Sequence, residues 1–460
     1  MASPVFAVVG HPNKGKSSIV STLAHDGSVA VGSVPGTTIR CREYPMRVDG
    51  ETQYVLVDTP GFQRPRGVLA WLKRQESNAV KRPRAVRKFL EIHTAEKTYP
   101  DECELLRPIM SGAGILYVVD GSKPYLAEYE AEMEILRWTG QPRMALINPI
   151  GSADHIQDWK AALGQYFNIV KVFNALMADF DKQLELLRSL ELLDDAWQPS
   201  LHQAIEVLQA SRRRRRSLAA HAIAEMLVEM LTFKVERKLD LDAQTGDVKT
   251  ELFRRYQKAL EKCERRCREH VEEIYEQTGI QRREPAIKML GETQLLSDES
   301  WRLFGLSRKQ LLAAGATGGG TMGVALDVAA SGISFGVFTV LGAGLGAAGS
   351  YFGARQLAKV KILNTTLGHK FAIVGPAQNI NFPYVALQRA RLHHALVANR
   401  AHARRDELKL ETVMEDRLPP LPESLRKRFD KTFSDLRQGL NLVRSVAALA
   451  RDLEELLDHG

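Results

Sequence analysis

The chain has 460 residues, and its 44% of hydrophobic and 26% of charged residues match the average of water-soluble globular proteins. This length predicts two or more domains, and the composition excludes a mostly disordered, collagen-like or polytopic membrane chain. The net charge of +8 is uneven, because residues 1–195 hold 23 basic and 24 acidic residues and the excess lies beyond them. A basic second half suits an anionic partner or a solvated surface.

The four cysteines show no disulfide-type spacing, which predicts reduced thiols in a reducing compartment. The first residues lack a basic segment followed by an apolar one, so we expect no signal peptide and a cytoplasmic protein. Cys263, Cys267 and His270 share one helical face, but both cysteines continue an apolar stripe. We therefore expect core packing there and not a metal site.

Short apolar runs in the first part of the chain have the pattern of buried parallel strands. They are residues 4–9, 54–57, 115–119, 144–147 and 169–173. Helix-like stretches separate several of them, so residues 1–195 are predicted to be a doubly wound α/β domain that binds ligands at the carboxyl ends of its strands. Residues 196–460 are predicted to be mainly α-helical, because long apolar stripes of helical period run from Leu252 to Ile274 and from Leu425 to Val446.

The segment from Gly10 to Ser17, GHPNKGKS, fits the phosphate-loop pattern GxxxxGK[ST] between a predicted strand and a helix. Its glycines let backbone N–H groups surround a phosphate, Lys16 neutralises β/γ charge, and Ser17 offers a hydroxyl to Mg²⁺. The residues expected to bind the nucleotide phosphates are Gly10, Asn13, Lys14, Gly15, Lys16, Ser17 and Ser18.

Two further segments predict a nucleotide switch. In Asp58-Thr59-Pro60-Gly61, which follows a strand, Asp58 can hold Mg²⁺ through water and the N–H of Gly61 can sense a γ-phosphate. Pro35-Gly36-Thr37-Thr38 lies between the two motifs and offers the hydroxyl of Thr38 to the metal when a γ-phosphate is present. The predicted metal ligands are therefore Ser17, Thr38 and Asp58.

Over about residues 4 to 180 the chain resembles the translation-factor-class GTPases of the Era and TrmE type. The resemblance implies slow Mg²⁺-dependent GTP hydrolysis, GTP and GDP as ligands, and catalytic roles for Lys16, Thr38, Gly61 and Asn13. It implies that Asn13 helps to bind a K⁺ ion in place of an arginine finger. Phe62 stands where classical small GTPases carry a water-orienting glutamine, which is typical of this group. The whole chain resembles a bacterial family that joins this GTPase to an uncharacterised C-terminal domain.

The base-reading motif departs from that family, because Asn148-Pro149-Ile150-Gly151 stands where Asn-Lys-x-Asp is expected. The aspartate that pairs with guanine is missing, although Asp154 lies close enough in sequence to replace it. The last motif is matched by Asn174-Ala175-Leu176, so Asn148 and Asn174 are the expected base-side residues. The prediction that the nucleotide is GTP therefore rests on the resemblance, and the sequence leaves open whether the base is guanine or adenine.

Residues 62–114 form a long interval before the next strand, and a helical insertion is predicted over about 62–110. Within 63–97 there are ten basic and three acidic residues. This insertion would move with the segment after Gly61. One interpretation is a surface that binds an effector or an anionic partner, and the other is a solvated lid helix. The arginine run 212–216 offers the same two readings.

Residues 310–354 contain 12 of the 34 glycines and one charged residue, Asp327. Several of these glycines are spaced four residues apart, and the segment is long enough for two stretches of about twenty residues each. Together these features predict a helical hairpin, which either contacts a membrane or is buried within the protein. The main hypothesis is a GTPase switch that couples nucleotide state to reversible contact of this hairpin with the inner membrane. The alternatives are a non-hydrolysing nucleotide-binding scaffold and an RNA or ribosome-assembly GTPase, and a nucleotide-dependent dimer is a further expectation.

Overall fold

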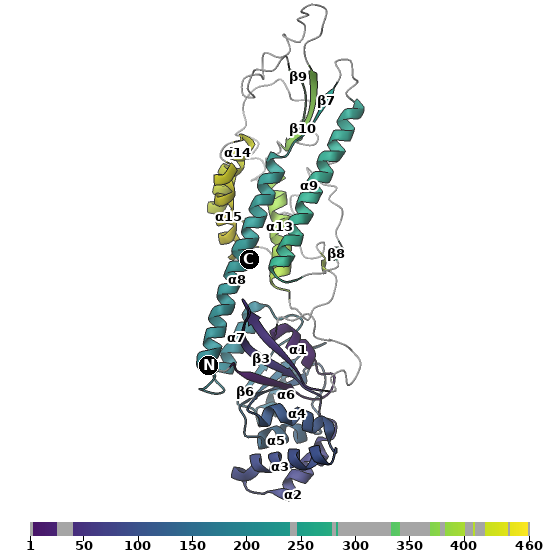
Figure 1. The fold of residues 1–460 in the computed structure, drawn as a ribbon, viewed down its shortest axis with the longest axis vertical. Coiled ribbons are helices and arrows are strands. Elements are labelled where there is room, and N and C mark those ends of the chain that lie inside the picture. Colours follow the sequence, from purple (N-terminus) through teal and green to yellow (C-terminus); the bar gives the residue numbers. More distant parts are fainter. Residues whose placement is uncertain are drawn as a thin grey trace, which may run out of the picture. The chain divides into compact units, whose positions relative to one another are not determined.

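The computed structural model describes residues 3–24, 40–239, 246–277, 282–283, 333–340, 369–377, 382–400, 408–409, 419–439 and 442–458. The chain divides into two compact units, Met1–Arg213 with Asn399–Asp406 and Arg214–Ala398 with Glu407–Gly460 (Figure 1). The sequence predicts a first domain that ends at residue 195. In the structure the long helix α8, Gln198–Thr232, contains the division between the two units.

The first unit contains a six-stranded sheet in the order β2-β3-β1-β4-β5-β6. Every neighbouring pair is parallel except β2 with β3. The strands are β1 (Val5–Val9), β2 (Arg42–Val48), β3 (Glu51–Asp58), β4 (Gly114–Asp120), β5 (Arg143–Asn148) and β6 (Ile169–Val172). The five predicted strands correspond to five of these. Strand β2 was not predicted, because Pro45 and several charged residues hide the strand pattern, as is usual at a sheet edge.

Helices cover both faces of this sheet, as the doubly wound prediction requires (Figure 1). On one face α1 (Lys16–Leu23), α7 (Phe180–Glu191) and the start of α8 pack against Phe6 and Val8 of β1. On the other face the insertion helices, α5 (Tyr129–Trp138) and α6 (Ile156–Leu163) pack against Ala7 and Val9. The alternation along β1 therefore supplies both cores, and the α/β fold class is confirmed.

The predicted insertion consists of α2 (Pro65–Gln75), a 3₁₀ turn (Ala79–Lys81), α3 (Arg82–Ala95) and α4 (Pro100–Met110). Its apolar side is part of the domain core, because Val68, Leu72, Val86 and Phe89 are fully buried there. The insertion is therefore an integral layer of the first unit, and most of its basic residues are exposed on the other side of its helices.

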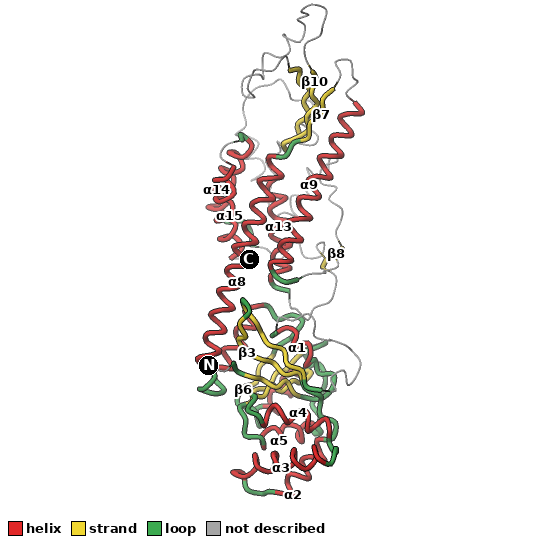
Figure 2. The backbone as a smooth tube through the Cα atoms, in the orientation of Figure 1, coloured by secondary structure: helices red, strands yellow, loops and turns green. Residues whose placement is uncertain are grey.

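The second unit is mainly helical (Figure 2). Its helices are the rest of α8, α9 (Gly246–Ile274), α13 (Phe382–Ala398), α14 (Glu423–Arg437) and α15 (Leu442–Asp458). Strands β7 (Val235–Leu239), β10 (His369–Ala377) and β9 (Ile333–Val340) form an antiparallel sheet in this order, and β8 (Arg282–Arg283) pairs with β11 (Leu408–Lys409). Cys263 and Cys267 are buried in the apolar stripe of α9, which confirms the core assignment.

The prediction of a helical hairpin over 310–354 is wrong for residues 333–340, the part of this segment that the structure describes. Residues 333–340 form strand β9, with Phe338 in register with Phe371 of β10. The physical reason is local composition, because Ile333, Phe335 and Val337 belong to residue types that favour strands. The rest of 310–354 lies outside the described residues. Among the helices that the structure describes, none is both long and apolar enough to cross a bilayer.

Candidate nucleotide-binding site

The segment from Gly10 to Ser17 connects β1 to α1, as its sequence pattern predicts. Three residues in it have positive φ angles, Gly10 at 144°, Asn13 at 61° and Gly15 at 83°. A Cβ atom on Gly10 would lie 2.4 Å from the carbonyl oxygen of Val118, so only glycine fits there. The loop therefore turns tightly into the N-terminus of α1, where unpaired backbone N–H groups favour an anion.

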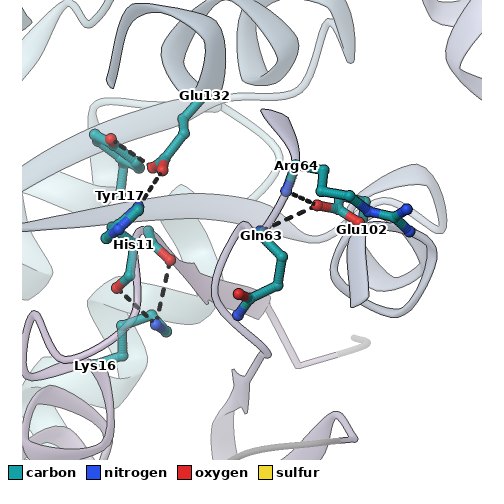
Figure 3. A network of polar contacts seen from close by, with 8 residues as sticks. His11, Lys16, Gln63, Arg64, Glu102, Tyr117 and Glu132 are labelled. Carbon is teal, nitrogen blue, oxygen red and sulfur yellow. Dashed lines mark hydrogen bonds and ion pairs between the residues drawn. The ribbon is translucent and has the colours of Figure 1, made fainter. Parts of the chain in front are cut away.

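The side chain of Lys16 is folded into this loop. It is 8% exposed, and its Nζ donates hydrogen bonds to the carbonyl oxygens of Gly10 at 3.2 Å and His11 at 3.1 Å (Figure 3). Burial lowers the pKa of Lys16 to about 8, and the carboxylates of Asp58 and Glu132 partly oppose this shift. Lys16 is thus a buried cation held at the wall of the loop, which suits a side chain that binds phosphate oxygens.

Ser17, in the first turn of α1, and Asp58, at the carboxyl end of β3, lie side by side. The register of β1 with β3 pairs Val8 with Asp58, and Ser17 Oγ donates a hydrogen bond to Asp58 Oδ2 at 2.9 Å. Oxygen donors of this kind are what Mg²⁺ prefers. The residues present therefore fit the predicted metal, with Ser17 and Asp58 as the groups that would hold it. Thr38, the third predicted ligand, lies outside the described residues.

Gly61 brings the second motif against the phosphate loop. A Cβ atom on Gly61 would lie 2.7 Å from both the nitrogen and the Cδ atom of Pro12, so the two backbones touch. The following Phe62 is fully buried in the core under the insertion helices. Its ring therefore lies in the core.

Asn148, at the end of β5, connects the phosphate loop to the segment after β6. Its Nδ2 donates to the carbonyl oxygen of Lys14 at 3.3 Å, and its Oδ1 accepts from the N–H of Ala175 at 3.2 Å. Asn174 stabilises the neighbouring loops, because its Nδ2 donates to the carbonyl oxygen of Pro149 at 2.9 Å. The structure therefore brings both predicted base-side residues to the same end of the sheet.

The position that normally carries the base-reading aspartate is Gly151, which is exposed. A Cβ atom there would meet only Ser122, at 3.5 Å or more. Asp154 is exposed and makes no ion pair with a described residue. Two further predicted phosphate-binding residues lie close to the loop. Asn13 is exposed within it, and Ser18 lies in the first turn of α1.

Sequence reasoning missed a polar network behind the loop. His11 Nδ1 and Glu132 Oε1 lie 2.8 Å apart, and Tyr117 OH donates to Glu132 Oε2 at 2.9 Å (Figure 3). Glu132, in the first turn of α5, is only 1% exposed. The ammonium group of Lys14 lies 5.6 Å from the ring centre of Tyr129 on the same helix. Helix α5 thus supports two loop residues, and an isolated glutamate in a helical pattern gives no signal for this.

A second buried carboxylate supports the segment after Gly61. Glu102 of α4 is fully buried, and its Oε1 accepts hydrogen bonds from the N–H groups of Gln63 at 3.0 Å and Arg64 at 2.5 Å (Figure 3). The guanidinium of Arg64 lies over the ring of Tyr99, 4.4 Å from its centre. The insertion is therefore joined to the backbone of this segment.

The two basic segments differ in their partners. None of the ten basic residues in 63–97 forms an ion pair with another described residue, and nine of them are exposed. In the arginine run, by contrast, Arg212 pairs with Asp181, Arg215 with Glu276 and Arg216 with Asp458. Intramolecular pairs therefore occupy much of the run, and this weakens the expectation that it binds an anionic partner.

Two family models match separate parts of the chain. The model described as "50S ribosome-binding GTPase" matches residues 5–148. The model described as "Domain of unknown function (DUF3482)" matches residues 160–455, which is more than half of the chain.

Two named relatives are similar to this chain over less than half of its length. GTPase Der of Paraburkholderia phymatum is 30% identical over 148 residues, which are 32% of this chain and 26% of that protein. GTPase Der of Prochlorococcus marinus is 26% identical over 201 residues, which are 41% of this chain and 36% of that protein. The matched segments thus span about a quarter to a third of these relatives.

Solved structures are similar at a low level. Era in complex with MgGDPNP and a segment of 16S ribosomal RNA has a TM-score of 0.30 and 17% identity, covering 52% of this chain and 73% of that one. A variant of Aquifex aeolicus Era bound to GDP and aluminium fluoride has a TM-score of 0.29 and 16% identity, covering 57% and 89%. Scores of this size do not establish a common fold, so the assignment rests on the family model, the named relatives and the loop.

Proposed function

This chain belongs to the DUF3482 family and carries a P-loop GTPase domain, and from this premise we propose that it is a Mg²⁺-dependent GTP-hydrolysing switch. The observation that supports the proposal is the convergence of Lys16, Ser17, Asp58 and Gly61 on one loop. A buried cation, a hydroxyl beside a carboxylate and a glycine N–H are the groups that phosphoryl transfer to water requires.

The proposed chemistry is attack of water on the γ-phosphate. Lys16 and the N–H groups of the loop stabilise the charge that develops on the phosphate oxygens, and Gly61 contributes its N–H from the other side. When bound, Mg²⁺ neutralises charge between the β- and γ-phosphates, and Ser17, Asp58 and Thr38 are its proposed ligands. Nucleotide binding is assigned to the loop residues and to Asn148 and Asn174.

Titration calorimetry with GDP, GTP and ATP in the presence of Mg²⁺ tests the binding part. We expect GTP and GDP to bind at least about tenfold more tightly than ATP, because polar base contacts discriminate strongly. Equal affinity for both bases would contradict guanine specificity. Tight GTP binding without any phosphate release would instead support the non-hydrolysing scaffold.

The role of Asn13 is a separate proposal, supported by its exposed position and its φ of 61° within the loop. If Asn13 helps to bind K⁺, phosphate release is faster in KCl than in NaCl, and Asn13→Ala removes the difference. A variant that keeps the KCl stimulation excludes the role. Asn168→Ala, at an exposed asparagine just before β6, is the matched control because it makes the same change of side chain outside the phosphate loop.

The insertion is the proposed surface for an anionic partner. On α3, Arg84, Arg87 and Lys88 are exposed on one side of the helix, and on α2 Lys73 and Arg74 are exposed near its end. Because no described acidic residue pairs with them, their charge is available to phosphate groups. Among the described residues of the insertion, Val80 is the one strongly exposed large apolar residue. A partner that offers many phosphate groups and few apolar contacts is typically a nucleic acid, so RNA is the proposed partner.

Binding of polyuridylate RNA at several salt concentrations tests this surface. We expect the affinity to fall as salt rises, and the double variant Arg84→Glu with Arg87→Glu to bind at least about tenfold more weakly. The matched control is Lys160→Glu with Arg188→Glu, which makes the same change in charge at two exposed basic residues of the same unit. Equal losses in both variants would show a nonspecific effect of net charge and would exclude the surface.

Membrane contact through 310–354 and a nucleotide-dependent dimer remain finer proposals. Flotation with phosphatidylglycerol vesicles, with and without GTP, tests the first, and light scattering under the same conditions tests the second. A chain that stays with the vesicles only when 310–354 is present would support the membrane proposal.

A further inference from the structure

The site as described contains no side chain that orients the attacking water. Phe62 is fully buried in the core, so it cannot reach a water molecule in the site. The next residue, Gln63, is exposed, and its side-chain amide makes no hydrogen bond to another residue in the described part of the chain. A glutamine amide can accept from a water molecule and donate to a phosphate oxygen at the same time.

Gln63 also lies within reach of the phosphate site. Gly61 touches Pro12 of the phosphate loop, and successive Cα atoms are about 3.8 Å apart, so the Gln63 backbone lies within about 8 Å of that contact. In Figure 3 the Gln63 side chain extends away from Glu102, which holds its backbone from the other side. The side chain is thus available to the site while the backbone is fixed.

Glu102 has the properties of a dedicated anchor for this backbone. It is fully buried on α4, one oxygen accepts from both Gln63 and Arg64, and its second oxygen has no hydrogen-bond partner among the described residues. Arg64 is the N-cap of α2 and has no side-chain cap of its own, so Glu102 supplies the cap from another helix. A carboxylate at this helix N-terminus is also favoured by the helix dipole.

We infer that Gln63 orients the attacking water and that Glu102 is the positioning residue that fixes Gln63 beside the phosphate loop. The inference rests on the proposed GTP hydrolysis and adds a catalytic residue to it. In this arrangement Gln63 holds the water in line with the γ-phosphate. The water oxygen bonds to phosphorus as the bond to the leaving GDP oxygen breaks, and the proton of the water passes to an oxygen of the released phosphate.

Single-turnover GTP hydrolysis by the full chain, alongside GDP and GMPPNP affinity, tests the inference. We expect Gln63→Ala to lower the rate about a hundredfold while both affinities stay within about threefold, because a water contact acts in the transition state. Gln75→Ala is the matched control, since Gln75 is an exposed glutamine at the far end of α2. We expect its rate to equal that of the unchanged chain.

The positioning role of Glu102 is read from a double-variant cycle. Glu102→Gln keeps an oxygen acceptor and should lower the rate without a change in GDP affinity, and the double variant with Gln63→Ala should be no slower than Gln63→Ala alone. If the double variant were slower than Gln63→Ala by the full factor that Glu102→Gln alone causes, the two residues would act independently and the positioning role would be overturned. If the unchanged chain hydrolyses GTP and Gln63→Ala does so equally fast, the role of Gln63 is overturned. If the unchanged chain does not hydrolyse GTP, the proposed function itself fails.

Discussion

Ser17 Oγ donates a hydrogen bond to Asp58 Oδ2 over 2.9 Å, and this contact joins the phosphate loop to the end of β3. The two residues are 41 positions apart in the sequence, and the parallel pairing of β1 with β3 brings them together. The contact places a hydroxyl beside a carboxylate, and these are the two groups that would hold a divalent cation in the proposed site.

Asp58→Asn tests this arrangement. The change keeps the shape and an oxygen acceptor but removes the charge that favours a divalent cation, so we expect Mg²⁺ to improve GTP affinity much less than in the unchanged chain. Calorimetry with and without Mg²⁺ measures the difference. Asp49→Asn, on the turn before β3, serves as the control. A full Mg²⁺ effect in Asp58→Asn would exclude Asp58 as a ligand.

Base recognition can be tested with one variant that should lose affinity for GTP and one that should gain it. If Asp154 reads guanine, Asp154→Asn weakens GTP binding and improves xanthosine triphosphate binding, because an amide can donate to the additional oxygen of xanthine. Gly151→Asp places a carboxylate at the position typical of the related GTPases, and the space around Gly151 accepts a Cβ atom. We expect this variant to bind GTP more tightly. Unchanged GTP and xanthosine triphosphate affinities in Asp154→Asn would remove Asp154 from the site.

Nucleotide affinity should depend on pH through Lys16. Its pKa is lowered to about 8 in the free protein, and bound phosphates keep it protonated, so binding takes up a proton above this pH. Affinity for GDP is therefore expected to be constant below about pH 8 and to fall by up to about tenfold per pH unit above it.

Glu132→Gln provides the matched test of that dependence. The carboxylate of Glu132 raises the pKa of Lys16, so its neutralisation should move the onset of the fall to lower pH. Calorimetric GDP titrations between pH 7 and pH 9 would measure both profiles. Identical profiles in the two proteins would show that the charge of Glu132 does not affect nucleotide binding through the pKa of Lys16.

The second unit contains a buried ion network that should carry much of its stability. Glu264 is 4% exposed, pairs with Arg268, and its Oε1 accepts from Arg389 Nε at 2.9 Å. Glu264→Gln removes the charge that both arginines contact, and we expect the free energy of unfolding to fall by about 3–5 kcal/mol. The control is Glu423→Gln at the exposed pair with Lys427, where solvent screens the charges and no measurable loss is expected. Urea unfolding measures both, and equal losses would contradict the importance of burial.

Much of the site could be predicted because its parts are encoded locally. Gly10 to Ser17 and Asp58 to Gly61 each combine a strand end with short-range residue patterns, and parallel pairing then brings them together. Glu102 and Glu132 could not be found in this way, because a glutamate in a helix is ordinarily exposed. Only the tertiary fold shows that they are buried against the backbone of Gln63 and the ring of His11.

The less successful predictions concern the second unit. The stripe from Leu425 to Val446 predicted one helix, but α14 ends at Arg437 and α15 begins at Leu442, with Gly439 at a φ of 71° between them. Val443, a predicted stripe residue, is 86% exposed. Periodicity continues across such a break by chance, and only the conformation of Gly439 shows where the helix ends.

Phosphate release from GTP and from ATP, with Mg²⁺ and with Lys16→Ala as the blank, tests the central claim most directly. The account predicts slow, GTP-selective release by the unchanged chain and none above background by Lys16→Ala, because Lys16 is the buried cation of the phosphate loop. Release that is absent, or that continues undiminished in Lys16→Ala, would contradict the claim that this domain hydrolyses GTP.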